Sequence, residues 1–277
     1  MSPSFLQRQL SWLALILLAA CATTGGAQSG PSREERAARL AKAEAMLAER
    51  CKTAGEKIHR TVDNVEGVLL MKLRPERINR EDQFVMDDPY GSTYAGEGYF
   101  ESFLWGRNEK GALDNTKIEG YRYVEAIDPK DGKRYRYTGA IRQVHIKPSV
   151  LMGEDPNGQG FYTTQFVLDK VPVSSAPPRY GVTYDDISTQ EEREYWIAGS
   201  SLRVIDLQTN HIIAERIGYM MDQGQGNTSG GRSPWLLAAD NACPKFGPEN
   251  VEVPRSFHQP RQTRNFVEKV LHLIREK

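Results

Sequence analysis

Hydrophobic positions recur along this sequence with two different periods. From Ser32 to about Val62, small and apolar residues return every three or four positions, and this spacing predicts one long amphipathic helix. The residues on this stripe are Leu40, Ala43, Leu47, Cys51, Ala54 and Ile58. Ser32 and Glu35 are placed as in a capping box, so the helix should begin there.

The rest of the chain is dominated by short runs rich in β-branched and aromatic residues, which predict strands. Tyr121 and Tyr123 alternate with other residues before the turn 128–132, and Tyr135 and Tyr137 alternate after it, as in a half-buried hairpin. The expected strands cover 67–74, 97–104, 121–127, 133–144, 161–168 and 180–184, and a hairpin follows over 201–221. Two further helices are expected, from Pro234 to about residue 242 and over 263–276.

These elements predict an α+β fold, with a mainly antiparallel sheet of about seven to nine strands, a long N-terminal helix and a C-terminal helix. We assign residues 32–247 to one globular domain and residues 248–277 to a C-terminal extension that carries the last helix. No internal repeat is present.

The first twenty residues have the features of an export signal. Arg8 precedes an apolar run from Leu10 to Ala20 that is too short to cross a bilayer as a permanent helix. The run ends in Leu18-Ala19-Ala20-Cys21, which resembles the lipobox of bacterial lipoproteins. That resemblance implies removal of residues 1–20 and lipidation of Cys21. The alternative is an ordinary secretory signal with an accidental cysteine.

The residues after Cys21 bear on where such a lipoprotein would be held. Ala22 occupies the position at which an aspartate would be the familiar inner-membrane retention signal, so the lipoprotein rule implies the periplasmic face of the outer membrane. Residues 21–31 are small, polar and Gly-rich, which is typical of a flexible linker.

Charge and cysteine content narrow the classes of partner. The chain has 36 basic and 36 acidic residues, and without the signal it stays nearly neutral, which argues against a general binder of nucleic acid or anionic lipid. If Cys21 is acylated, Cys51 and Cys243 remain, and an even pair in an oxidising compartment indicates a disulfide. The alternative is that both are small buried residues that never meet.

No motif of catalytic or metal-binding residues stands out. The sequence has no Gly-x-Ser-x-Gly elbow and no zinc-protease helix pattern, and its five histidines are scattered. We therefore expect no enzyme activity, no metal and no cofactor. The Gly-rich loop 224–231 either cradles an anion on its N–H groups or serves as a connection that needs positive φ.

Two segments have the composition of a protein-binding surface. One is rich in glycine and aromatic residues, and its candidate contact residues are Tyr90, Tyr94, Tyr99 and Trp105. The other is an acidic run that could attract a partner with a basic rim, and its candidate residues are Asp185, Asp186, Glu191 and Glu192. The alternative for each is ordinary sheet packing or a solvated loop.

Across 49–246 the sequence resembles a family of proteobacterial lipoproteins. The resemblance is carried by the segments 49–51 (ERC), 64–68 (NVEGV), 87–92 (DDPYGS), 126–132 (AIDPKDG), 179–188 (RYGVTYDDIS), 196–201 (WIAGSS), 230–235 (GGRSPW) and 240–244 (DNACP). Members are similar to lipoproteins encoded beside type VI secretion phospholipase effectors, and they are taken to be immunity proteins.

The resemblance implies that this chain binds and neutralises a secreted phospholipase toxin at the membrane that the toxin attacks. Covering the lipase active site would need no catalytic group in the immunity protein. Two alternatives stay open: a structural or accessory envelope lipoprotein of a secretion or transport apparatus, and an enzyme acting on a periplasmic substrate.

Overall fold

The computed structural model describes residues 31–75, 83–91, 96–105, 120–146, 160–248 and 253–274. Its strands are β1 (Gly55–Ile58), β2 (Val62–Val65), β3 (Gly67–Leu70), β4 (Tyr123–Ile127), β5 (Arg134–Ile146), β6 (Phe161–Pro172), β7 (Tyr180–Asp186), β8 (Ile197–Asp206), β9 (His211–Met221), β10 (Ala242–Cys243) and β11 (Leu271–Leu273). Its helices are α1 (Arg33–Cys51), α2 (Glu97–Leu104), α3 (Gln190–Glu194), α4 (Pro234–Ala238) and α5 (Gln262–Val270). Short 3-10 turns are η3 (Ser229–Gly231), η4 (Ala239–Asn241), η5 (Arg255–Phe257) and η6 (Gln259–Arg261).

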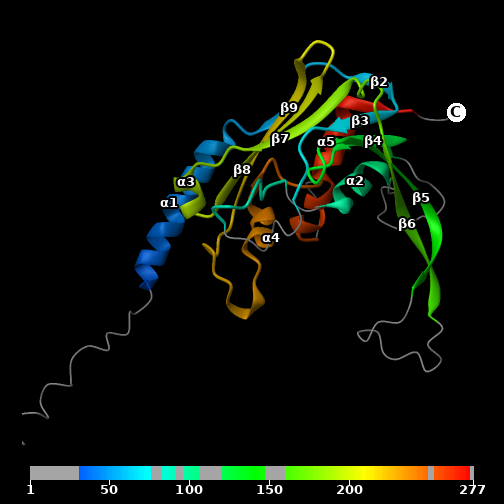
Figure 1. Ribbon diagram of the computed structural model, residues 1–277. Coiled ribbons are helices and arrows are strands. Elements are labelled where there is room, and N and C mark those ends of the chain that lie inside the picture. The colour runs from blue at the N-terminus through cyan, green and yellow to red at the C-terminus, as the bar shows by residue number, and fades with distance from the viewer. Residues whose placement is uncertain are drawn as a thin grey trace, which may run out of the picture. The chain divides into compact units, whose positions relative to one another are not determined.

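A nine-stranded sheet dominates the fold, in the order β1-β9-β8-β7-β3-β4-β5-β6, with β10 also paired to β9 (Figure 1). Within this sheet, β3 runs parallel to both β4 and β7, and the other pairs are antiparallel. The predicted α+β class with a mainly antiparallel sheet is confirmed at this level. β3 reads Gly-Val-Leu-Leu and is almost wholly buried, as expected for a parallel strand covered on both faces.

Most predicted strands correspond to observed ones. Those expected over 121–127, 133–144, 161–168 and 180–184 are β4 to β7, and the hairpin expected over 201–221 is formed by β8 and β9. The strand expected over 67–74 ends early, at Leu70.

Contacts divide the chain into a unit of residues Met1–Ala38 and a unit of residues Arg39–Lys277. The first unit is described from Pro31 onward, as the start of α1. There the expected capping box is present: the Ser32 N–H donates to Glu35 Oε2 at 2.7 Å, and the Glu35 N–H donates to Ser32 Oγ at 3.1 Å. These bonds lower the pKa of the Glu35 carboxyl.

The prediction that the first helix continues to about Val62 is wrong, because α1 ends at Cys51. The Thr53 hydroxyl donates to the Arg50 carbonyl at 3.0 Å, and Gly55 follows with a φ of +149°. The next residues pair with β9, with Gly55 opposite Ile217. The apolar spacing of Ala54 and Ile58 suited a helix, but pairing with a distant strand overrides such local preference.

The strand predicted over 97–104 is also wrong, because this segment forms α2. Its buried residues are Tyr99, Phe100, Phe103 and Leu104, which are spaced as one face of a helix. A short apolar run of this kind does not by itself distinguish a strand from a buried helix.

The last helix is shorter than predicted and belongs to the main core. α5 ends at Val270, and β11 pairs in parallel with β2 instead of continuing the helix. Phe266, Val267 and Val270 are almost fully buried, in the same cluster as residues of β3, β4, β7 and β8. The segment 248–277, which the sequence set apart as an extension, thus contributes its helix to the core of the domain.

Candidate functional site

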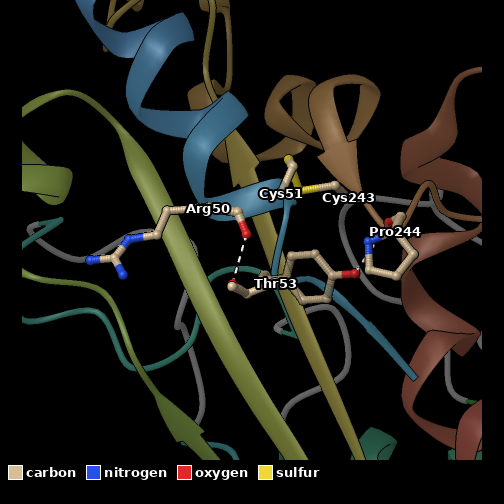
Figure 2. The surroundings of a disulfide bond; sticks show 6 residues. Arg50, Cys51, Thr53, Cys243 and Pro244 are labelled. Carbon is tan, nitrogen blue, oxygen red and sulfur yellow. Dashed lines mark hydrogen bonds between the residues drawn. A yellow bond between two sulfur atoms is a disulfide. The ribbon is translucent and has the colours of Figure 1, made fainter. Parts of the chain in front are cut away.

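A disulfide links Cys51, at the end of α1, to Cys243 in β10, with their Cα atoms 5.6 Å apart (Figure 2). This confirms the predicted pairing. Close by, Tyr90 Oη donates to the carbonyl oxygen of Pro244 at 3.3 Å. The disulfide closes a loop of 192 positions, for which the chain-entropy model gives a stabilisation of at most about 5 kcal/mol.

The aromatic segment supplies core residues. Tyr90 and Tyr99 are 1% and 2% exposed, so neither side chain can reach a partner. Both are packing residues, which was the alternative to a binding surface. Tyr90 lies 4.8 Å from the ring of Phe246, and burial raises the pKa of Tyr90 to about 12. Trp105 stacks on Phe166 with ring centroids 5.6 Å apart. Tyr94 lies outside the described residues.

The acidic run is paired within the chain. Asp185 binds Arg203, and Asp186 binds Arg193 and accepts the Ser188 N–H at 2.8 Å. These contacts use the acidic side chains to hold the segment between β7 and β8.

The two glutamates of this run connect α3 to α1. Glu191 forms an ion pair with Lys42 at 3.1 Å, and the buried Glu192 binds Arg50. Lys42 also lies 4.6 Å from the centre of the Tyr195 ring, and the bonds to Tyr195 and Glu191 raise the pKa of Lys42. Each of these two glutamates therefore has a basic partner in α1.

The Gly-rich loop is closed around a carboxylate of the chain itself. Asp222 is fully buried and accepts the N–H groups of Gly224 at 3.0 Å and Gly226 at 2.8 Å. Arg232 Nη1 also donates to Asp222 Oδ2 at 2.8 Å, and its bonding to Asp222 raises the pKa of Arg232. A Cβ at Gly226, whose φ is +81°, would lie 2.2 Å from the Trp196 ring. The loop is therefore a connection that needs positive φ, at Gln225, Gly226, Gly230 and Gly231, and its N–H groups bind the Asp222 carboxylate of the chain itself.

A buried ion pair that the sequence did not reveal lies under α2. Arg74 Nη2 lies 2.9 Å from Asp88 Oδ2, and both side chains are almost fully buried. Asp88 has a φ of +52° and accepts the Gly91 N–H at 3.0 Å, while the Arg74 guanidinium lies 3.9 Å from the centre of the Tyr184 ring. The sequence Asp88-Pro89-Tyr90-Gly91 is typical of a turn, but it does not indicate the basic partner of Asp88.

The crevice beside this pair is small. It is partly open to solvent, has no internal space for a water molecule, and is lined by Arg74, Gly91, Tyr99, Ser102, Pro260 and Thr263. Sites for small molecules usually span about 300–1,000 Å³. The buried pair is therefore best understood as part of the scaffold.

Exposed apolar residues lie on two segments that contact each other, α4–η4 and the segment around η5. The Arg255 N–H donates to Asp240 Oδ1 at 2.8 Å and joins the two segments. Exposed large side chains flank this contact on both segments, and we name them the α4 patch: Leu236 (49% exposed), Leu237 (39%), Val253 (46%) and Phe257 (69%). Apolar surface rimmed by polar groups is typical of sites for protein partners.

The described residues contain no group of three or more His, Cys, Asp or Glu side chains placed to hold a metal ion. In the same part of the chain, no helix has the length and apolar character needed to span a membrane. Cys21 lies outside the described residues.

Comparison with known proteins gave no match: no family model fits the chain, and no curated protein or solved structure is similar to it.

Proposed function

We propose that this chain is an immunity lipoprotein: lipidated on Cys21, held at the periplasmic face of the outer membrane, and neutralising a type VI secretion phospholipase by binding it. The observation that carries the proposal is the Cys51–Cys243 disulfide, taken with the lipobox-like end of the signal. Disulfides persist in oxidising compartments outside the cytoplasm. A lipase delivered there attacks the adjacent membrane, so its inhibitor must be exported and held at that surface.

The α4 patch is the face that we assign to the toxin. Its exposed leucine, valine and phenylalanine side chains lie on the two segments that the Asp240–Arg255 contact joins. Apolar anchors surrounded by a polar rim supply most of the binding energy in protein interfaces. Inhibition would follow from covering the lipase active site or blocking its lid.

The test is co-purification of the chain from Ala22 onward, which keeps every described residue, with the phospholipase encoded beside its gene. We expect a stoichiometric complex. Leu236→Asp and Phe257→Asp should each lower its affinity about 100-fold or more, as loss of an interface anchor does. Ile127→Asp is the matched control, because Ile127 is an equally exposed apolar residue (57%) on β4.

The possible results separate the function from the face. Absence of any complex, with full lipase activity, would overturn the immunity proposal and favour an accessory envelope lipoprotein. A complex that tolerates both patch substitutions would retain immunity and reject the α4 patch as its face.

A further inference from the structure

The β5–β6 hairpin extends beyond the strand that supports it. β4 pairs only with residues Arg134 to Tyr137 of β5, whereas β6 pairs with β5 as far as Ile146 (Figure 1). We name residues 138–146 and 161–169 the arm. Among the described residues, the arm is a ribbon of two strands, covered at Phe166 by the ring of Trp105. A two-stranded ribbon is only marginally stable in water and gains stability from further cover.

Among the residues that the structure describes, no strand pairs with the outer edge of β6, which carries a row of outward-directed backbone groups. The Val173 N–H donates to the Arg134 carbonyl at 3.0 Å, and the pairing continues without a bulge to Phe161. Because ladder bonds alternate along an antiparallel pair, the residues that direct N–H and C=O outward are Tyr162, Thr164, Phe166, Leu168 and Lys170. Pro172 falls on the same outward row, where a missing N–H is tolerated.

The composition of this edge favours pairing with another chain. Residues 161–168 read FYTTQFVL, with no charge and no proline. Protein edges are usually blunted by charges, prolines or covering segments. Here three large apolar side chains of β6 are also exposed: Phe161 (45%), Tyr162 (72%) and Val171 (51%).

We propose that the edge is covered by a second copy of this chain, with the two β6 strands antiparallel and a two-fold axis at Phe166. This register places Thr164 opposite Leu168 of the other copy, and each outward residue then exchanges two backbone bonds with its opposite. Pro172 lies just beyond the last pair. This inference does not depend on the proposed immunity function.

The same register places exposed apolar side chains of one copy opposite exposed apolar side chains of the other. Phe161 lies opposite Val171 of the second copy, at both ends of the interface, so each covers a side chain that is about half exposed in the single chain. Tyr162 lies opposite Lys170, where a ring and an ammonium group attract each other. No two like charges of β6 face each other in this arrangement.

The test is sedimentation equilibrium of the disulfide-bonded chain from Ala22 onward. We expect a dimer that Thr164→Pro dissociates, because the proline removes an outward donor and leaves the ladder to β5 intact. Thr164→Ala is the control; it loses the hydroxyl that accepts from Gln143 Nε2 at 2.7 Å and keeps the backbone donor. Circular dichroism of both variants establishes that they are folded.

Two double variants test the register. Phe161→Lys with Val171→Glu places opposite charges face to face across the two-fold axis, and it should dimerise. Phe161→Lys with Val171→Lys places like charges there, and it should dimerise at least about tenfold more weakly. A monomeric wild type, equal dimerisation of the two double variants, or a dimer that withstands Thr164→Pro would each overturn the proposal.

Discussion

The N–H of Gly226 donates to Asp222 Oδ2 at 2.8 Å, so the Gly-rich loop is folded around a buried carboxylate that also binds Arg232. Asp222→Asn should remove the charge that attracts the guanidinium and destabilise the fold by about 2 kcal/mol, the range for a bond to a charged group. Urea unfolding measures this. Asp240→Asn, at an exposed carboxylate that accepts one backbone N–H, is the control and should have a smaller effect.

The disulfide gives a second prediction. Replacing Cys51 and Cys243 together by alanine should lower the free energy of unfolding by about 2–5 kcal/mol, because the unfolded chain regains the freedom of a long loop. Denaturant unfolding should give the same free energy of unfolding for the double variant and for reduced wild type. An unchanged free energy of unfolding would mean that the link constrains nothing in the unfolded chain.

Asp206 should make the free energy of unfolding depend on pH in the acidic range. Its buried carboxylate binds Arg179 at 2.9 Å and Arg60 at 2.5 Å, and the bond from Arg179 is the main cause that holds the pKa of Asp206 far below its usual value. The folded pKa lies below the unfolded value of about 3.9, so this stabilisation is present above that pH and is lost as the pH falls.

The measurement for Asp206 is the urea midpoint at several pH values. Wild type should lose more stability than Asp206→Asn between about pH 5 and pH 2, so that the two curves converge in acid. Glu44→Gln, on the exposed side of α1, is the control and should run parallel to wild type. Parallel curves for Asp206→Asn would contradict the assignment.

Lipidation is tested by labelling cells with palmitate. Wild type should incorporate the label, and Cys21→Ser should not, because the thiol is the acyl acceptor in the lipobox. Cys51→Ser keeps Cys21 and should be labelled like wild type. Label retained in Cys21→Ser would contradict the lipoprotein assignment.

The sequence predicted the elements whose pattern is local. The β8–β9 hairpin and β4 to β7 have short alternating or apolar runs with turn residues between them, and the cysteine count indicated the disulfide. The end of α1 and the shortness of α5 could not be predicted in this way. In each case the chain leaves the helix to pair with a strand far away in sequence, β1 with β9 and β11 with β2.

The candidate contact residues were misplaced for a related reason. Tyr90 and Tyr99 have a composition that suits a binding surface or a core equally well, and only the packing of α2 and Phe246 decides between these. Glu191 and Glu192 looked like free charges because their partners, Lys42 and Arg50, lie in α1, far away along the chain.

The most direct test of the immunity proposal is titration of the neighbouring phospholipase with the chain from Ala22 onward, on phospholipid vesicles. We predict that lipase activity falls linearly to zero at a fixed stoichiometry, and that it returns when Phe257→Asp replaces wild type. Full lipase activity at a large molar excess of the folded wild-type chain would contradict the proposal.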